Sequence, residues 1–207
     1  MCIPTHEMED RKYFFKHCLE SLWNQSFQDF EIVVTDNSED DVIKDICEWF
    51  RTGIRYIRNP KKGMAQNTNE AIKQAKGSYI KILYMDDYLL HDEVLASAIS
   101  KMSGEWLIMG SGNNSNPHWT NDIHLGNNRL GSPSALMVKN KSPILFDEKL
   151  TWLLDCDLYK RYYDAFGEPS IVPGKHIGIG EGTHQMTHII SNERKLSEHD
   201  YLTKKYE

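Results

Sequence analysis

Aspartates occupy several places in the sequence where carboxylates could do chemistry. Asp36 ends the apolar run 31–36, and the neighbouring acids Asp86 and Asp87 end a second apolar run. Two adjacent carboxylates repel each other unless a cation or hydrogen-bond donors lie close to them. Mg²⁺ and Mn²⁺ prefer a few carboxylates together with phosphate oxygens. The pair therefore favours a cation site shared with a diphosphate ligand, although the same acids would also serve as helix caps or solvated loop residues.

A further aspartate, Asp155, stands at the start of a helix expected over residues 155–166, and Asp157 follows it closely. The positive end of the helix dipole favours the ionised form of an acid at this place. An ionised, positioned carboxylate is also what a general base must be. The alternative is an ordinary acid at a helix N-terminus.

Four histidines fall late in the chain: His176, His184, His188 and His199. Imidazole is a good ligand for Mn²⁺. The spacing of His184 and His188 is that of a metal pair on a helix, but no helix is expected there and no HExxH motif exists. Exposed or structural histidines remain the alternative.

Apolar runs and helical patterns alternate along the chain. This alternation predicts an α/β fold with a Rossmann-like, mostly parallel central sheet flanked by helices. Strands are expected at residues 1–4, 31–36, 54–57, 78–85, 106–110 and 135–139, and helices at 11–24, 38–50, 65–75, 92–102 and 155–166. Such sheets bind ligands at the carboxyl ends of their strands, where Asp36, Asp86 and Asp87 would meet. Because neighbouring side chains of a strand point to opposite faces, Asp86 and Asp87 are expected to contact different groups.

Two regions lack a regular pattern. Residues 110–134 are rich in Gly, Asn, Ser and Pro and include His118 and Trp119. A loop of this length is usually functional or disordered, so we expect either a lid over the donor or acceptor or a disordered insertion. The chain after Glu168 shows little regular structure. No linker separates a second domain, which predicts one catalytic domain over residues 1–207.

The composition weighs against several classes of protein. The 207 residues carry a formal net charge of -6, which disfavours a nucleic-acid-binding protein. The four cysteines form no CxxC motif and are expected to be buried, reduced thiols. No apolar run reaches the ~18 residues needed to span a bilayer, and no signal peptide is visible. We therefore expect a cytoplasmic protein without an integral membrane segment; contact with a membrane through a lipid acceptor stays open.

Several segments, in this order, resemble family 2 glycosyltransferases, which have the GT-A fold. The N-terminal segments are IPT at 3–5, CLESLWNQSF at 18–27, EIVVTDNSEDD at 31–41 and IRNPKKGMAQNTNEAIKQAKGSYIKILYMDDYL at 57–89. The later ones are NRLGSPSALMVK at 128–139, FDEKLTWLLDCDLYKR at 146–161 and, more loosely, EGTHQMTH at 181–188. Each segment is a weak motif by itself, and their shared order carries the resemblance.

The resemblance implies a role for each matching residue. Thr5 would contact the nucleotide and Asp36 its base, typically uracil, while Asn69 matches a recurrent asparagine of the donor site. Asp86 and Asp87 match the Asp-x-Asp-type element of the family, and strand alternation then assigns ribose or sugar to Asp86 and a divalent cation, Mn²⁺ or Mg²⁺, to Asp87. His184 would be an additional metal or diphosphate contact. Asp155 would be the general base.

The resemblance also implies a reaction, the inverting transfer of a sugar from a nucleotide sugar, most often UDP-linked, to a hydroxyl acceptor. That acceptor would be a glycan, a lipid-linked sugar or another alcohol, as in polysaccharide biosynthesis. Two departures from the family pattern concern the donor nucleotide. His6 and Glu7 replace a frequent Tyr-Asn, and Thr68 stands where many relatives carry an arginine.

Three other readings of the sequence compete with a transferase. A nucleotidyltransferase would carry a glycine-rich loop after the first strand, and residues 5–11 contain no glycine. A degenerate, non-catalytic nucleotide-sugar-binding module would not need all of the four acids Asp36, Asp86, Asp87 and Asp155. A receiver-like signalling domain would be shorter, and its lysine would not follow so long a loop as the one before Lys139.

Overall fold

The N-terminal part of the chain forms a three-stranded parallel sheet. In this computed structural model, which describes residues 1–50 and 53–207, β1 (Cys2–Thr5) pairs with β2 (Ile32–Asp36), and β2 pairs with β3 (Ile54–Arg58). The register places Thr5 beside Asp36. The carboxyl ends of these strands therefore meet at one edge of the sheet, as the sequence predicts.

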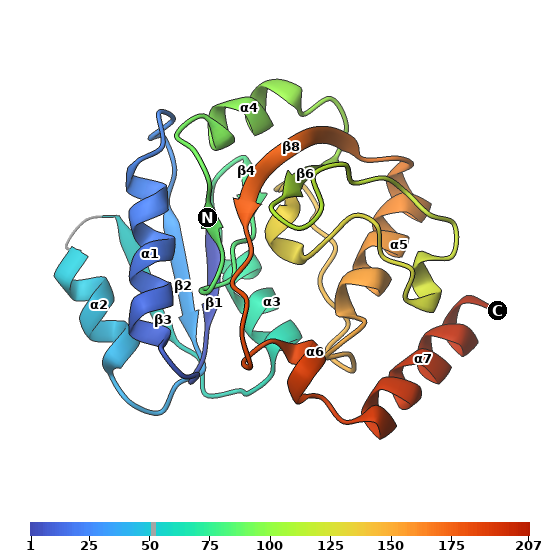
Figure 1. Cartoon of the computed structure of the whole chain (residues 1–207). Coiled ribbons are helices and arrows are strands. Elements are labelled where there is room, and N and C mark those ends of the chain that lie inside the picture. Colours follow the sequence, from blue (N-terminus) through green and yellow to red (C-terminus); the bar gives the residue numbers. More distant parts are fainter. Residues whose placement is uncertain (51–52) are drawn as a thin grey trace.

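Helices cover both faces of this sheet (Figure 1): α1 (Arg11–Trp23) and α2 (Val42–Phe50) lie on one face and α3 (Met64–Gln74) lies on the other. The helices α4 (Val94–Lys101) and α5 (Leu154–Phe166) pack against the second sheet described below. Side chains alternate along β1, so Ile3 packs into a core with α1 and α2, whereas Cys2 packs into a core with α3 and α5. β1 and β2 are thus buried on both sides, which explains their apolar runs, whereas the edge strand β3 is half-buried.

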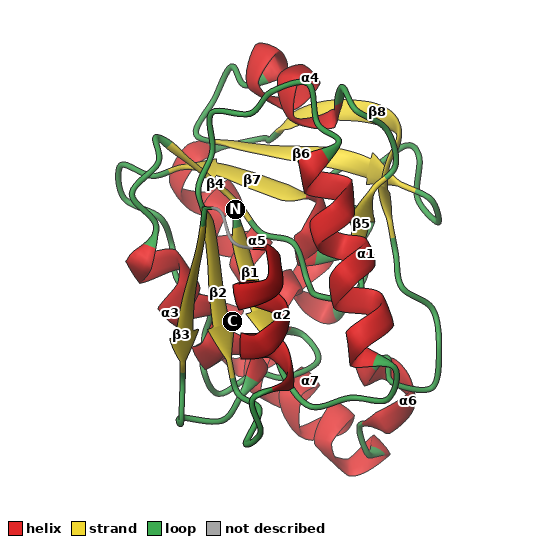
Figure 2. Ribbon diagram, turned by 90° about the vertical axis from the view of Figure 1, so that its left-hand side faces the viewer, coloured by secondary structure: helices red, strands yellow, loops and turns green. Residues whose placement is uncertain are grey.

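A second sheet of five strands continues from β1. Its order is β4 (Tyr79–Lys81), β7 (Leu136–Lys139), β6 (Trp106–Ser111), β8 (Ser170–Gly178) and β5 (Tyr88–Leu89). The pair β6 and β8 is parallel and the other pairs are antiparallel. A parallel bridge from Cys2 to Ile82 joins the two sheets, whose strands run in crossing directions in Figure 2. The predicted α/β class is confirmed, and the mixed second sheet adds to it.

The strand expected at residues 78–85 ends much earlier than the sequence pattern indicates. Beyond Lys81 the backbone leaves the ladder: Leu83 N–H donates to the Cys2 carbonyl at 3.0 Å, and Tyr84 N–H donates to Ser134 Oγ at 2.9 Å. Met85 and Asp86 lie in a turn. The expectation of strand geometry up to Met85 is therefore wrong, and strand alternation does not decide where the following acids point.

The chain after Glu168 is more regular than its sequence indicates. It forms the nine-residue strand β8, the short helix α6 (Met186–Ile189) and the helix α7 (Asn192–Tyr206). Ser191 caps α7, since its side chain accepts a hydrogen bond from the backbone N–H of Arg194. Figure 1 shows α6 and α7 in red on the side of the molecule that carries α5.

The segment 110–134 is packed against the rest of the protein. It contains two short 3₁₀ helices, at Ile123–Leu125 and Pro133–Ala135. The ring of Trp119 stacks on Tyr163 of α5 with a centroid distance of 3.9 Å. This contact fastens the middle of the segment to α5, whereas its last residues approach the site described below.

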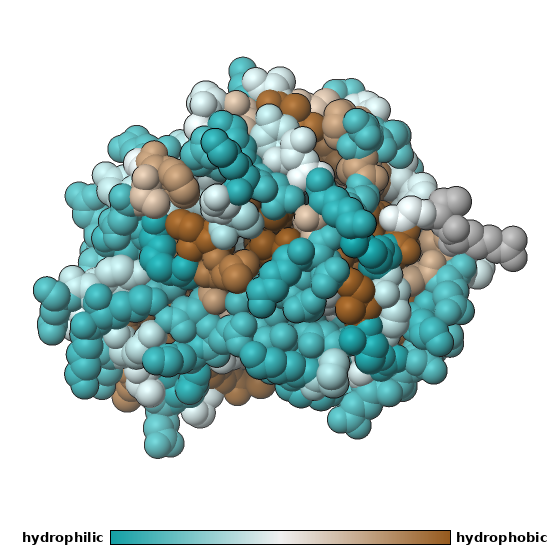
Figure 3. Space-filling view, turned by 180° about the vertical axis from the view of Figure 1, so that it is seen from behind, coloured by the Kyte–Doolittle hydropathy of each residue, from teal (hydrophilic) through white to brown (hydrophobic). Residues whose placement is uncertain are grey.

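The surface is mainly hydrophilic, and the cysteine thiols lie in the interior. Hydrophilic side chains cover most of the face seen in Figure 3, and apolar residues gather near its centre. All four cysteines are buried and free, as expected. Within residues 1–50 and 53–207, no helix combines the length and hydropathy that crossing a bilayer requires.

Candidate active site

A cavity of about 740 Å³ opens at the carboxyl edge of the parallel strands. This is within the size range of small-molecule sites. Residues that follow β1, β2 and β4 line one side, and residues of the 131–133 turn, the start of α5 and the segment 179–189 line the other. Asp86, Asp87, Asp155 and His184 all line it. Acids distant in the sequence, Asp86 and Asp87 on one side and Asp155 on the other, thus converge on one cleft.

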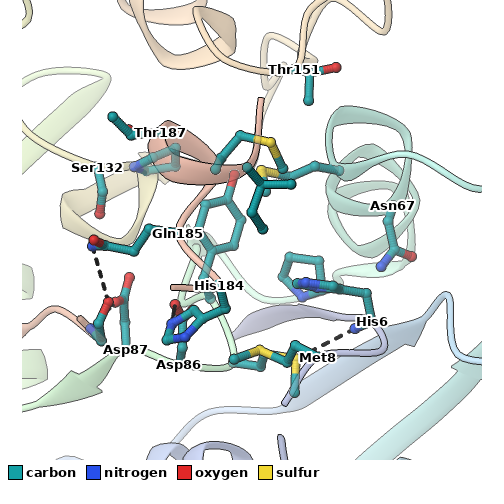
Figure 4. A pocket seen from close by; sticks show the side chains of 18 of the residues that line it. His6, Met8, Asn67, Asp86, Asp87, Ser132, Thr151, His184, Gln185 and Thr187 are labelled. Atoms are coloured by element: carbon teal, nitrogen blue, oxygen red, sulfur yellow. Dashed lines mark hydrogen bonds and ion pairs between the residues drawn. The ribbon is translucent and has the colours of Figure 1, made fainter. Parts of the chain in front are cut away.

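Asp86 and His184 contact each other in this cavity (Figure 4). His184 Nε2 lies 3.1 Å from Asp86 Oδ2, and both side chains stay partly exposed to the cavity, at 12% and 21% respectively. The ring of Phe14 packs on His184 with a centroid distance of 4.9 Å and fixes the imidazole plane. A carboxylate and an imidazole are thereby presented together to any ligand in the cavity.

Asp87 is placed differently from its neighbour. Its side chain is buried, and Oδ1 accepts a hydrogen bond from the backbone N–H of Gly180 at 2.9 Å. Burial and the adjacent Asp86 charge raise the pKa of Asp87. The buried Lys81 lies nearby, and burial lowers the pKa of its ammonium to about 7. Asp87 thus ties the segment that carries His184 to the end of the sheet.

Asp155 lies in the first turn of α5 and reaches the cavity from the opposite wall. Asn128 Nδ2 donates to Asp155 Oδ2 at 2.8 Å, and the backbone N–H of Cys156 lies 2.7 Å from Oδ1. Desolvation by the surrounding protein raises the pKa of Asp155, and the hydrogen bonds oppose this rise. One carboxylate at the cavity wall is therefore oriented and still basic.

The other residues singled out from the sequence lie behind the cavity rather than on its wall. Thr5 Oγ1 donates to Asp36 Oδ1 at 2.9 Å, and Asp36 also accepts from the Tyr56 hydroxyl at 2.8 Å; Thr5 and Asp36 are fully buried. Asn69 is buried too, and its amide exchanges two hydrogen bonds with the Phe146 backbone. In this structure Thr5 and Asp36 shape the wall through their neighbours Pro4, His6 and Asn37, which line the cavity, whereas Asn69 and Phe146 lie away from it.

Sequence reasoning missed several polar side chains that the structure brings to the cavity. They are His6, Lys62, Asn67 and Tyr84 on the wall, and Asn128 behind Asp155. Lys62 follows the Asn59-Pro60 turn, where a basic pair was visible in the sequence. The Tyr84 hydroxyl is buried and has no hydrogen-bond partner among the residues that the structure describes.

The donor set at Asp86 fits a divalent cation that is held mainly by its ligand. Mg²⁺ and Mn²⁺ typically keep only one or two protein ligands when they bind substrate phosphates. Asp86 and His184 supply one carboxylate and one imidazole on the same wall. In the described part of the chain no group of three His, Cys, Asp or Glu side chains converges as a closed metal site. The cavity therefore suits a cation bridged by a diphosphate.

Comparison with protein families identifies the chain. The family model "Glycosyl transferase family 2" matches residues 1–162. These residues include β1 to β3, the Asp86–Asp87 turn and the first turn of α5. The chain belongs to glycosyl transferase family 2, and the resemblance seen in the sequence is confirmed.

Curated relatives match mainly the N-terminal part. The chain is 30% identical over 105 residues to the GalNAc(5)-diNAcBac-PP-undecaprenol beta-1,3-glucosyltransferase of Campylobacter jejuni, which covers 48% of this chain and 31% of that protein. It is 34% identical over 95 residues to a chondroitin synthase of Escherichia coli, covering 44% of this chain and 13% of that protein. The chain spans less than a third of the length of these relatives.

Solved structures share the GT-A fold over most of the chain. S. aureus TarS 1-349 in complex with UDP-GlcNAc has a TM-score of 0.70 at 19% identity, covering 92% of this chain and 62% of that chain. The mannosyltransferase PcManGT from Pyrobaculum calidifontis, in complex with GDP-Man and Mn²⁺, has a TM-score of 0.69 at 13% identity. It covers 99% of this chain and 64% of that chain. At these identities the likeness establishes the fold.

Proposed function

We propose that this chain is an inverting glycosyltransferase that moves a sugar from a nucleotide-diphosphate sugar to an acceptor hydroxyl. The single observation that carries the proposal is the convergence of Asp86, His184 and Asp155 on one cavity. A UDP-sugar is the favoured donor, since TarS, with the same fold, was solved with UDP-GlcNAc. The names of the relatives favour an acceptor that is a growing glycan or a lipid-linked sugar, and hence a role in polysaccharide biosynthesis.

The donor would lie along the edge of the parallel strands. We propose that Asn37 and Lys62 border the nucleotide, with Thr5 and Asp36 holding that wall from behind. Asn69, which lies away from the cavity, would act only indirectly, through the Phe146 backbone. Asp86 and His184 would hold Mn²⁺ or Mg²⁺ against the diphosphate, and Asp87 remains a candidate ligand on the same turn. When bound, the cation would neutralise negative charge on the leaving diphosphate.

Asp155 would act as the general base. Its carboxylate would take the proton of the acceptor hydroxyl while the hydroxyl oxygen forms a bond to the anomeric carbon and the bond to the diphosphate breaks on the opposite face. The transition state would have oxocarbenium character, as in glycoside chemistry generally. Asn128 keeps the base oriented.

A panel of nucleotide sugars tests the proposal. Thermal unfolding is followed with UDP-, GDP- and dTDP-sugars, each with and without Mn²⁺. A ligand that binds only the native state raises the melting temperature, so we expect a cation-dependent rise for one donor class. The matching donor is then incubated with candidate acceptors, and released nucleotide is measured. No rise with any donor would refute the proposal, and a rise without transfer would favour a non-catalytic binding module.

A further inference from the structure

The C-terminal helix α7 contacts the wall that carries the proposed base. Glu198 of α7 is 2% exposed. Its two carboxylate oxygens accept hydrogen bonds from three successive backbone N–H groups, those of Thr151 at 2.8 Å, Trp152 at 2.8 Å and Leu153 at 3.0 Å. These residues directly precede α5, and Asp155 is its second residue.

Burying a carboxylate is costly unless charge-assisted hydrogen bonds compensate it. Glu198 has such compensation on both sides, because Arg194 Nε also donates to it at 2.8 Å. Arg194 in turn donates to the Lys149 carbonyl. The segment 151–153, which precedes the proposed base Asp155, is therefore held by Glu198, a charged side chain at least 45 residues further along the sequence.

A second set of contacts joins α7 to α5 at Asp157, which follows Asp155 in the sequence. Lys205 Nζ lies 2.7 Å from Asp157 Oδ1 and 2.8 Å from Asp147 Oδ2. The Tyr206 hydroxyl donates to Asp157 Oδ1 at 2.7 Å. Asp157 is fully buried, so this side of α5 is turned towards α7 while Asp155 reaches the cavity.

The helix also connects the two walls of the cavity. Lys195 Nζ lies 5.4 Å from the centre of the Trp152 ring and donates to the Thr187 carbonyl at 2.9 Å. Trp152 belongs to the base wall and Thr187 to the segment that carries His184, and both residues line the cavity. Residues 192–206 lie outside the part of the chain that the family model matches, residues 1–162.

We propose that Glu198 is a positioning residue: by holding the N–H groups of residues 151–153, it fixes Asp155 and Trp152 at the acceptor side of the cavity. The inference rests on the proposed function, since it assigns α7 to the acceptor wall of that site. Glu198 touches no substrate in this account. Its loss should lower kcat and leave nucleotide binding at the opposite wall unchanged.

Three variants of the full chain test the inference. Glu198→Gln keeps the size of the side chain but replaces one accepting oxygen by a donor that faces N–H groups. Glu198→Asp keeps the charge and withdraws it by one methylene. Glu193→Gln is the matched control, because it removes the same charge from an exposed position in the first turn of α7.

Hydrogen exchange of residues 151–153 and steady-state kinetics are the two readouts. We expect the exchange rate of these amides to rise about 10-fold or more in Glu198→Gln, because the variant loses a hydrogen bond to a charged group. In Glu198→Gln we expect kcat to fall while the dissociation constant for UDP and Mn²⁺ stays unchanged. The fall in kcat should be smaller in Glu198→Asp and absent in Glu193→Gln. If Glu198→Gln does not fold, Glu198→Asp is compared with Glu193→Gln in the same way.

Unchanged exchange, or raised exchange with unchanged kcat, would overturn the positioning role. A merely structural role would lower the melting temperature and leave kcat the same at temperatures where the protein is folded. Failure of the proposed function looks different, since the parent chain would then bind no nucleotide sugar while the exchange experiment still reports on Glu198.

Discussion

Removing the Asn128 side chain should shift the pH at which the proposed base becomes active. Asn128 Nδ2 donates to Asp155 Oδ2 at 2.8 Å, and this bond stabilises the charged carboxylate. Burial already raises the pKa of Asp155, and Asn128 is one of the groups that oppose the rise. In Asn128→Ala the pKa of Asp155 should therefore rise further.

The size of the shift follows from one hydrogen bond. A bond to a charged group contributes about 1.5–3 kcal/mol, and about 1.4 kcal/mol corresponds to one pH unit. Asp155 is partly exposed to the cavity, so water replaces some of the lost stabilisation. We take the lower end and expect a shift of about one pH unit.

The sign is fixed by the role of the base. Only the deprotonated carboxylate accepts the acceptor proton, so the rate rises with pH through the pKa of Asp155 and then levels off. In Asn128→Ala this acid limb should move to higher pH. The assay is kcat/KM against pH for the donor that the thermal-shift panel identifies, with released nucleotide as the signal.

The matched control is Asn127→Ala, because the Asn127 amide contacts Asp122 and not Asp155. Asn128 also accepts from Leu130 and Gly131 N–H, so its removal loosens the turn and can lower the plateau rate. The position of the acid limb does not depend on that loss. An acid limb at the same pH in the parent and in Asn128→Ala would refute the assignment of Asp155 as the base.

Two further predictions concern the wall that carries His184. Asp86→Asn should raise the Mn²⁺ concentration needed for half-maximal donor binding, measured by calorimetry, because a neutral amide is a weaker cation ligand than a carboxylate; an unchanged Mn²⁺ dependence would remove Asp86 from the cation site. Gly180→Ala should weaken cation-dependent donor binding, because the added Cβ would lie 2.8 Å from Asp86 Cβ and would clash with the Asp86 carbonyl oxygen. Gly112→Ala is the control, since its Cβ would meet only ordinary contacts, and equal donor binding by the two alanine variants would contradict the packing argument.

The sequence predicts the elements whose stability comes from burial of apolar side chains. The runs that form β2, β3, β6 and β7 are buried or half-buried in the sheets, so hydrophobicity alone locates them. The edge where β1, β2 and β3 end follows from their parallel topology, which explains why a ligand cleft was expected there.

The remaining elements depend on contacts that a local pattern does not contain. The strand before Asp86 stops where Leu83 and Tyr84 donate to Cys2 and Ser134 instead of to a neighbouring ladder. Helix α7 has a weak apolar face, since Leu196 is 67% exposed and only Leu202 and Glu198 are buried. Its contacts are polar bonds to residues 147–153 and to Asp157 of α5, together with Leu202 in the core, and the Ser191 cap is a local signal that could have located its start.

The division of roles between Asp86 and Asp87 shows the same limit. Strand alternation was the basis for assigning the metal to Asp87 and sugar or ribose to Asp86. The structure puts these acids in and after a turn, where Asp86 lies beside His184 and Asp87 receives the Gly180 N–H. We therefore propose Asp86 with His184 as the first cation ligands to be tested.

The most direct test of the central claim compares donor binding and turnover in Asp155→Asn. The claim is that Asp155 works as a base in the same cavity in which Asp86 and His184 hold the diphosphate. Loss of a general base typically lowers the rate about 100- to 10,000-fold. We predict a loss of this size in released nucleotide, with an unchanged dissociation constant for the nucleotide sugar and Mn²⁺. Turnover equal to that of the parent chain would contradict the account.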